Sequence, residues 1–301
     1  MRLATTTGDF NEYGITQEEA LRHIKEAGFS YADYNFGQDF KRNDGFFGEN
    51  AKKHLESLKR TLYELDMKLI QSHAPMGEPI REWEGRRDFI EMNKSCIEAC
   101  GMLGIPNIVI HTGYERGLTV EETFYRNKKF YNELLPVAEK NNVYILAENF
   151  NKMCIDGLYW IDNAKDLKDF IDYMNHPYLK ACWDAGHGNM IDVSQEESLK
   201  VLGGCVYALH IQDNDGNDDL HYAPYFGSLS IDSLMIGLKA IGYNGYFTFE
   251  STNFPVCGYK RKKSDKSDKL VNIPLHIKKS AESLLYEIGK HILTVYDEYE
   301  E

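Results

Sequence analysis

The chain has 301 residues, of which 43% are hydrophobic, so it can bury one substantial core. Its formal net charge of −13 at pH 7 repels the phosphate backbone of nucleic acids, which disfavours general nucleic-acid binding and favours a small neutral or chelating substrate. Six cysteines without a Cys-x-x-Cys pair are too sparse for a disulfide scaffold. No signal-peptide apolar run and no stretch of about 18 apolar residues is visible, so we expect a cytoplasmic protein without a membrane span.

Patterns typical of strands and helices alternate strictly along the chain. In chain order we predict strand 3–7, helix 16–27, strand 31–36, helix 49–65, strand 69–73, helix 83–103, strand 107–112, helix 120–141, strand 143–150, helix 164–174, strand 179–184, helix 194–202, strand 206–212, helix 231–241, strand 245–250 and helix 274–296. This alternation implies parallel strands with right-handed crossovers. An open doubly wound sheet is the rival architecture, but it would not bring the ends of strands three to eight to one point. We therefore predict a (β/α)8 TIM barrel that forms a single domain over residues 1–301.

Six of the predicted strands end on or near a side chain that can bind a metal ion. These residues are His73, His111, Glu148, Asp184, His210 and Glu250. Successive members lie 38, 37, 36, 26 and 40 residues apart, about 35 on average, which is the length of one strand-loop-helix-loop unit. Because the carboxyl ends of barrel strands surround one mouth, we expect the six side chains to converge there.

The strongest candidates for metal binding come from the last four strands, and they are Glu148, Asp184, His210 and Glu250. Two glutamates, one aspartate and one imidazole form a hard, mostly oxygen donor set that suits Mn²⁺, Mg²⁺ or Co²⁺ and also accepts Zn²⁺. The alternative is four unrelated surface or salt-bridged residues. Their position at four consecutive strand ends argues against that interpretation.

Five weaker candidates for metal or substrate binding are His73, His111, His187, Asp219 and His221. His187 follows Asp184 by three residues in a glycine-containing segment, and a loop there can fold the imidazole back toward a metal or its substrate. Asp219 and His221 lie in the loop after the seventh predicted strand. For each of the five, the alternative is a hydrogen-bonded residue that supports the site without binding its ligand.

Several aromatic and cysteine residues also bear on the site. Aromatic residues that follow strand ends are candidates to wall a pocket, although core packing is their default role: Phe10, Tyr13, Phe36, Phe150 and Phe254. Trp183 alternates away from Asp184 and should pack outward against helices. Cys96 and Cys100 share a helix face, and we interpret them as buried reduced thiols rather than metal ligands.

The motifs at the strand ends resemble those of the xylose-isomerase-like barrel superfamily, which contains sugar isomerases and epimerases together with the type IV apurinic endonucleases. The motifs that carry the resemblance are Ser72-His73-Ala74, His111-Thr112-Gly113, Ala147-Glu148-Asn149, Trp183-Asp184-Ala185-Gly186-His187, His210-Ile211-Gln212-Asp213, Asp219-Leu220-His221 and Phe249-Glu250-Ser251. The resemblance covers essentially the whole chain. It implies that Glu148, Asp184, His210 and Glu250 match the single divalent-metal site of the ketose epimerases. It also implies that the five weaker candidates complete a set similar to the three-zinc site of the endonucleases, although the loop from His210 to Asp219 is shorter here.

Our leading hypothesis is a metal-dependent isomerase or epimerase that acts on a sugar or sugar phosphate through an enediolate. A bound metal would polarise the substrate carbonyl and make the neighbouring C–H proton easier to remove. The resemblance implies that Glu148 and Glu250 serve as acid and base as well as ligands, that His187 steadies a substrate oxygen, and that His73 and His111 line the substrate site. The residues leave open whether the barrel is a monomer or a homo-oligomer.

Three alternatives are compatible with the same residues. The loop after His210 offers aspartates where sugar epimerases usually have a basic residue, which leaves room for a dehydratase or lyase acting on an oxidised sugar. The nine-residue set fits a multi-zinc, endonuclease-IV-like phosphodiesterase, but the acidic chain argues against a DNA substrate. Its basic cluster, Lys260 to Lys269, is interpreted as a solvated loop. A non-catalytic, metal-bound sugar sensor is the third alternative.

Overall fold

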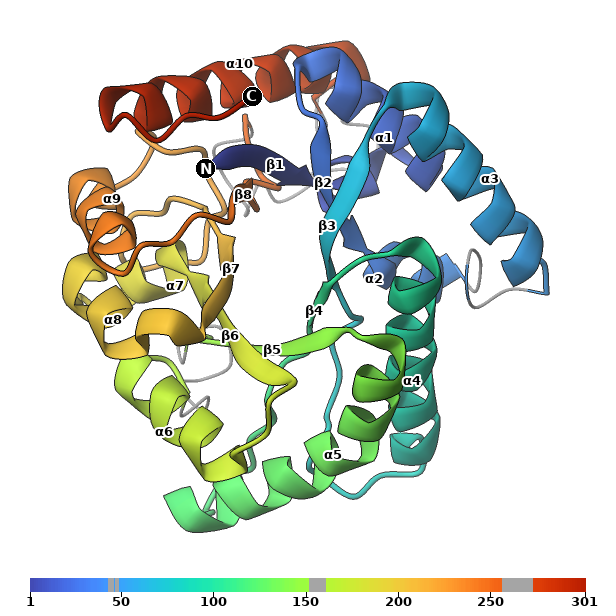
Figure 1. The fold of residues 1–301 in the computed structure, drawn as a ribbon, viewed down its shortest axis with the longest axis vertical. Coiled ribbons are helices and arrows are strands. Elements are labelled where there is room, and N and C mark those ends of the chain that lie inside the picture. Colours follow the sequence, from blue (N-terminus) through green and yellow to red (C-terminus); the bar gives the residue numbers. More distant parts are fainter. Residues whose placement is uncertain (43–45, 47–48, 152–160, 256–272) are drawn as a thin grey trace, which may run out of the picture.

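The computed structural model describes residues 1–42, 46, 49–151, 161–255 and 273–301. Within these residues, eight parallel strands form a ring with helices around it (Figure 1). The strands are β1 (Arg2–Thr6), β2 (Tyr31–Asn35), β3 (Lys68–His73), β4 (Asn107–Val109), β5 (Tyr144–Glu148), β6 (Leu179–Asp184), β7 (Val206–His210) and β8 (Tyr246–Phe249). From β1 to β7 each strand pairs with the next in sequence, and β1 also pairs with β8.

The ring closes between β7 and β8. Immediately after β7, the Ile211 amide donates to the Thr248 carbonyl at 2.8 Å, and the Glu250 amide donates to the Ile211 carbonyl at 3.0 Å. These two bonds satisfy backbone groups that an open sheet would leave at its edges. The predicted (β/α)8 TIM barrel is confirmed, and the open doubly wound sheet is excluded.

Eight long helices surround the strands, as the sequence predicted. They are α1 (Gln17–Ala27), α3 (Ala51–Leu65), α4 (Arg86–Leu103), α5 (Val120–Asn141), α6 (Ala164–Met174), α8 (Gln195–Leu202), α9 (Ile231–Ala240) and α10 (Leu275–Val295). Local signals set several of their ends. Thr16 and Glu19 form a reciprocal capping box at the start of α1, and Gly28 ends that helix at φ +118°. No helix in the described part of the chain has the length and hydrophobicity that a bilayer crossing requires.

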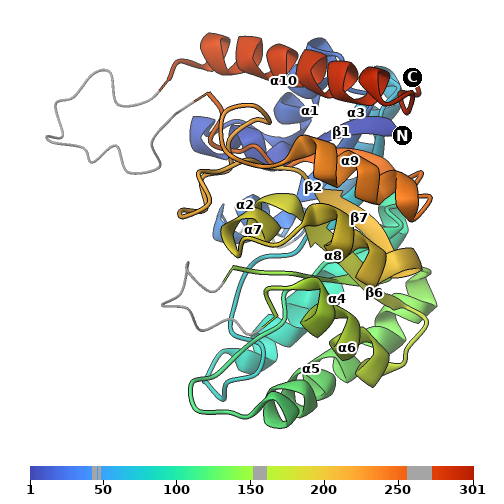
Figure 2. The same cartoon turned by 90° about the vertical axis from the view of Figure 1, so that its left-hand side faces the viewer.

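Short helices at the barrel mouth were not predicted. They are the 3-10 helix η1 (Thr7–Tyr13) after β1, α2 (Phe36–Arg42) after β2 and α7 (Ala185–Met190) after β6. Each directly follows the carboxyl end of a strand, and Figure 2 shows α2 and α7 at the same end of the barrel. These segments therefore shape the mouth where the candidate site lies.

The main core fills the space between the strands and the outer helices. Trp183 is fully buried there, and its Nε1 donates to Gln195 Oε1 at 2.8 Å at the start of α8, so its predicted outward packing is confirmed. Cys96 and Cys100 are buried in α4, as expected for structural thiols, and burial raises the pKa of Cys100 to about 12. The predicted loop Lys260 to Lys269 lies outside the described residues.

Candidate metal centre and active site

The first set of converging residues, the central group, consists of Glu148, Asp184, His210 and Glu250 at the carboxyl ends of β5 to β8. One donor atom of each lies within 4.8 Å of those of the other three. His210 stands between the glutamates: its Nδ1 is 2.6 Å from Glu148 Oε1 and 3.6 Å from Glu250 Oε2. Glu148, Asp184 and His210 are buried, whereas Glu250 is partly exposed. The strand register thus brings together the four residues that the sequence ranked first.

A second set, the histidine-pair group, consists of His73, His111 and Glu148. The Nε2 atoms of His73 and His111 are 3.1 Å apart, and His111 Nε2 is 2.7 Å from Glu148 Oε2. Glu148 turns its other oxygen, Oε1, toward His210. One carboxylate is therefore shared by two donor groups, an arrangement that can bridge two cations.

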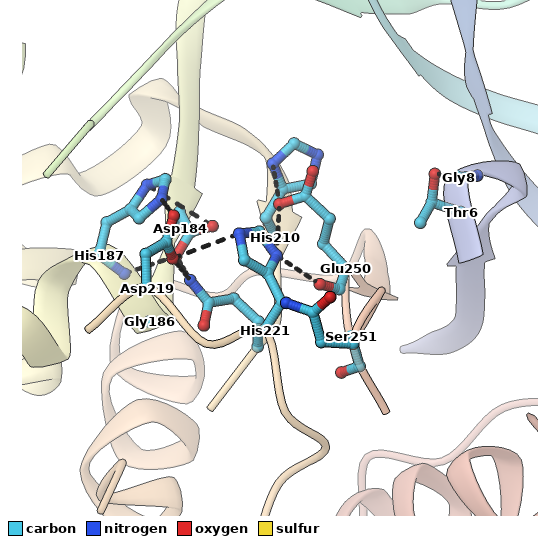
Figure 3. A network of polar contacts seen from close by, with 12 residues as sticks. Thr6, Gly8, Asp184, Gly186, His187, His210, Asp219, His221, Glu250 and Ser251 are labelled. Carbon is cyan, nitrogen blue, oxygen red and sulfur yellow. Dashed lines mark hydrogen bonds and ion pairs between the residues drawn. The ribbon is translucent and has the colours of Figure 1, made fainter. Parts of the chain in front are cut away.

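The third set, the loop group, consists of His187, Asp219 and His221. His187 Nε2 is 3.5 Å from Asp219 Oδ2, and His221 Nε2 is 3.2 Å from Asp219 Oδ1. Figure 3 shows this group beside Asp184 and Glu250, while Thr6 and Gly8, at and just after the end of β1, stand apart. All nine predicted ligand residues are thus brought together at one mouth. That they bind metal remains a prediction.

His187 reaches the site through α7, where the sequence predicted a loop. Asp184 caps this helix, because its Oδ1 accepts a hydrogen bond from the His187 backbone N–H at 2.7 Å. Gly186 lies in the first turn against Gln212, and a Cβ at this position would approach the Gln212 side chain to 2.1 Å. The sequence predicted that a loop could fold this imidazole back, and the structure has a capped helix in place of that loop.

Three of the imidazoles are oriented by backbone carbonyls. Their Nδ1 atoms lie close to carbonyl oxygens as follows: His73 to Ala74 at 2.7 Å, His187 to Asn149 at 2.8 Å and His221 to Glu250 at 2.8 Å. A carbonyl oxygen only accepts, so Nδ1 carries a proton, and Nε2 is the nitrogen that faces the other donors. This is how protein folds present histidine to a metal ion.

Sequence reasoning missed the residues that support these ligands from below. His210 has the opposite orientation, because its Nε2 lies 3.3 Å from Asp33 Oδ2 and its Nδ1 faces Glu148. Gln71 donates to the same Asp33 oxygen at 2.8 Å. The only sequence signal for this pair was the presence of an aspartate and a glutamine inside strands predicted to be buried.

The pKa values of several site residues are shifted because carboxylates and imidazoles lie close together and are buried. Burial raises the pKa of Asp184 to about 7. Against the effect of burial, the His210 charge and hydrogen bonds from His111 and His210 hold the pKa of Glu148 well below its ordinary value. Also against burial, Asp184 and Asp219 raise the pKa of His187 to about 10. The carboxylates of the site therefore stabilise a positive charge bound between them, whether on an imidazole or on a cation.

The donor atoms of the site suit divalent cations. Asp184 Oδ2 and His187 Nε2 are buried without a hydrogen-bond partner, although each belongs to a donor group. Buried polar atoms are rarely left unpaired, and oxygen and imidazole donors at this spacing are what Mn²⁺, Co²⁺ or Zn²⁺ binds. A cation in each of the two groups would satisfy these atoms and take the place of protons held by the imidazoles.

The donor groups form one wall of a cavity of about 360 Å³ at the barrel mouth. Asn11 and Asn35 line it from the β1 and β2 side, and Phe40, Met76 and Phe150 add apolar surface. Among the described lining residues there is no lysine or arginine. Phe150 is the one predicted pocket aromatic that lines this cavity in the described structure, since Phe10, Phe36 and Phe254 are buried in the core.

The xylose isomerase-like TIM barrel family model matches residues 21–272, which include all nine converging residues. The chain belongs to this family. Membership agrees with the ring of strands and with the position of the candidate site at the carboxyl ends of β3 to β8. Because family members differ in their reactions, function has to be argued from the residues of the site itself.

Curated relatives represent both chemical branches of the family. An inosose isomerase from Bacillus licheniformis is 24% identical over 178 residues, which cover 56% of this chain and 62% of the isomerase. A probable endonuclease 4 from Thermotoga maritima is 27% identical over 165 residues, covering 54% of this chain and 56% of the endonuclease. Sequence similarity is therefore shared between a sugar isomerase and a nuclease.

Solved structures confirm the fold along the whole chain. A D-tagatose 3-epimerase-like protein has 20% sequence identity and a TM-score of 0.76, with 99% of each chain covered. The IOLI protein, crystallised with a zinc atom, has 16% identity and a TM-score of 0.77, covering 98% of this chain and 99% of that protein. At these sequence identities the two structures show the fold alone.

Proposed function

We propose that this protein is a divalent-metal-dependent isomerase or epimerase of a small carbohydrate. The observation that carries the proposal is the placement of two glutamates, Glu148 and Glu250, on either side of His210 at the end of one cavity. Such a pair can act on a substrate carbon from two sides. The cavity of about 360 Å³ falls in the range of small-molecule sites.

The central group would hold the metal. Its oxygen and imidazole donors fit Mn²⁺, Mg²⁺, Co²⁺ or Zn²⁺. A divalent cation bound there would supply Lewis acidity toward a substrate carbonyl and its neighbouring hydroxyl. The chain's own residues must then orient the substrate, exclude water and carry the proton.

Proton transfer is assigned to the two glutamates. Glu148 is kept ionised by His210 and its other imidazole neighbours, so it can accept a proton at Oε1 or Oε2 once one of its contacts loosens. Glu250 extends from the end of β8, lines the cavity and is the more exposed of the two, so it can reach a substrate there. In an epimerase one removes the proton and the other returns it to the opposite face of the carbon.

Substrate orientation is assigned to three imidazoles that line the cavity, His73, His111 and His187. His187 is held rigidly by its bond to the Asn149 carbonyl, so its Nε2 occupies a fixed position for a substrate oxygen. Asn35 lines the far wall, and its Oδ1 accepts from the Gly37 amide at 2.9 Å, which leaves the amide nitrogen as the donor.

Solvent exchange tests this proposal across many sugars at once, because deuterium enters any compound from which the site removes a proton. Metal-loaded protein is incubated in D₂O with a panel of ketoses, aldoses and inososes, and deuterium incorporation is followed by mass spectrometry. We expect label beside the carbonyl of at least one compound and its loss in both Glu148→Gln and Glu250→Gln. Loss of water or carbon–carbon cleavage in place of exchange would instead identify a dehydratase or lyase. A fully loaded protein that labels and converts nothing would contradict the proposal.

A second candidate function, phosphodiester hydrolysis, is favoured by one specific observation. The central group and the histidine-pair group share Glu148, and the loop group lies at the same mouth, so the site has donors for more than one cation. Metal stoichiometry and cleavage of DNA containing an abasic site separate the two functions. About three tightly held zinc ions per chain with DNA cleavage would support hydrolysis. One exchangeable metal and no cleavage would support the isomerase.

A further inference from the structure

Beneath the central group lies a buried carboxylate that the proposed reaction does not use. Asp33, in the middle of β2, points into the barrel and is 1% exposed. Its Oδ2 lies 3.3 Å from His210 Nε2 and accepts a hydrogen bond from Gln71 Nε2 at 2.8 Å. Thr248 donates to Gln71 Oε1 at 3.2 Å, so strands β2, β3, β7 and β8 are joined by one chain of polar contacts.

This carboxylate has few ways to compensate its burial. Its second oxygen, Oδ1, has no hydrogen-bond partner, and Gln71 is a neutral donor. A buried charge with so little support is unfavourable unless a positive or strongly polarised group lies beside it. The His210 ring is that group. It becomes strongly polarised when its Nδ1 binds a cation, because the Nε2–H then carries more positive charge.

His210 differs from three other imidazoles of the site in the group that accepts its ring N–H. His73, His187 and His221 place their Nδ1–H against neutral carbonyl oxygens, whereas His210 faces a carboxylate. A carboxylate strengthens imidazole donation more than a carbonyl does, since the bond is charge-assisted. Asp33 also fixes which nitrogen keeps its proton, because a cation that took the place of the proton on Nδ1 would leave the Nε2–H directed at Asp33.

We infer that Asp33 is a positioning residue that acts through His210 and makes the central group the first of the three donor groups to bind a metal ion. This inference rests on the proposed metal site and deepens it, because it assigns an order of occupancy. Without Asp33, His210 is free to protonate Nδ1 or to rotate, and the central group loses its advantage over the histidine-pair and loop groups.

The test is Co²⁺ binding to the full-length protein, followed by competition with a chelator and by the visible spectrum of the ion. Asp33→Asn keeps the shape of the side chain and removes its charge. We expect the first Co²⁺ equivalent to bind about 10- to 100-fold more weakly and with an altered spectrum. Asp9→Asn is the matched control, since Asp9 is an equally buried carboxylate whose contacts are Thr5, Lys278 and Glu282. It should leave both readouts unchanged.

Equal Co²⁺ affinity and spectrum in Asp33→Asn and the wild type would overturn the inference while leaving the metal site intact. Wild-type protein that binds no Co²⁺, Mn²⁺ or Zn²⁺ would instead overturn the metal site itself, and the inference with it. If Asp33→Asn does not fold, Gln71→Met replaces it, because loss of the Gln71 donor frees the Asp33 carboxylate. Several-fold weaker Co²⁺ binding is expected there, and unchanged binding would overturn the inference.

Discussion

In the described part of the barrel, two of the clusters of buried charge handle their carboxylates differently. The first comprises the three donor groups, in which carboxylates are surrounded by imidazoles. The second, the lysine cluster, consists of Asp9, Lys278 and Glu282 between η1 and α10. Lys278 Nζ lies 3.3 Å from Glu282 Oε2 and 3.9 Å from Asp9 Oδ1, and it donates to the Phe254 carbonyl at 2.9 Å. Only the lysine cluster has a permanent cation of its own.

The difference separates a structural cluster from a functional one. A lysine keeps its charge unless burial is severe, and here Asp9 and Glu282 outweigh burial and raise the pKa of Lys278. An imidazole can exchange one of its ring protons for a metal ion, so its nitrogen atom is available to an external cation. The donor groups, which are suited to binding an external cation, therefore contain histidines. The lysine cluster, which joins η1 to α10, contains its own cation.

The largest expected effect comes from breaking the shared carboxylate of the donor groups. Glu148→Gln removes a charge that two groups use, so metal affinity should fall by at least about 100-fold. Deuterium exchange should fall by about 1,000-fold or more, because a proton acceptor is lost as well. Metal content after dialysis and exchange rates in D₂O measure the two effects.

Glu282→Gln is the matched control for this prediction. It makes the same chemical change at a fully buried glutamate of the lysine cluster. Metal affinity and exchange should remain near those of the wild type, and only stability should respond. If the two variants lost metal to the same extent, the division into a functional and a structural cluster would be wrong.

The next effect comes from removing the lysine cluster's own cation. Lys278→Met leaves Asp9 and Glu282 buried without a positive partner, and breaking a buried pair in this way lowers the free energy of unfolding by about 3–5 kcal/mol. Urea denaturation of the metal-loaded protein measures the loss. Cobalt affinity should stay the same, since Lys278 contacts no donor group in the described structure. A stable variant with weakened metal binding would contradict the comparison.

Removing metal from the donor groups should lower the free energy of unfolding somewhat less than Lys278→Met does. At free metal about 100 times its Kd, binding adds about 2.7 kcal/mol to the free energy of unfolding. Chelation should remove this contribution from the wild type and, by the same amount, from Lys278→Met, because distant sites act additively. Unequal losses would show that the two clusters are coupled.

Most of the fold could be predicted from the sequence because each strand and long helix has its own spacing of hydrophobic residues, and several helices have capping residues at their ends. Thr16, Glu19 and Gly28 mark α1 locally, and the structure places its helix between them. The short helices were missed for a physical reason. Gly186 and Gly188 are poor helix formers, and α7 depends instead on the Asp184 cap and on close packing against Gln212 and Trp183.

The positions of the six strand-end residues were predictable because parallel strands end at one edge, so strand-end side chains meet. Their orientation was not. The tautomers of His73 and His210 depend on the Ala74 carbonyl and on Asp33, and the second of these partners is distant in sequence. Asp33 lies inside a strand, not at its end, so the strand-end pattern that revealed the ligands does not reveal the carboxylate that supports them.

The smallest expected effect sharpens the comparison through pH. Burial and the Glu282 charge raise the pKa of Asp9 well above its ordinary value of 3.8, so between that value and the raised pKa the folded state holds a proton that the unfolded state has released. Stability must then fall as pH rises through this window, by about 1.4 kcal/mol for each unit of the shift. Asp9→Asn cannot ionise and should lack this fall, while Co²⁺ affinity stays unchanged. Urea denaturation of the metal-free wild type and of Asp9→Asn, from pH 4 upward, measures this fall in stability. If the free energy of unfolding changed with pH in the same way in both proteins, Lys278 would be shown to keep Asp9 ionised throughout.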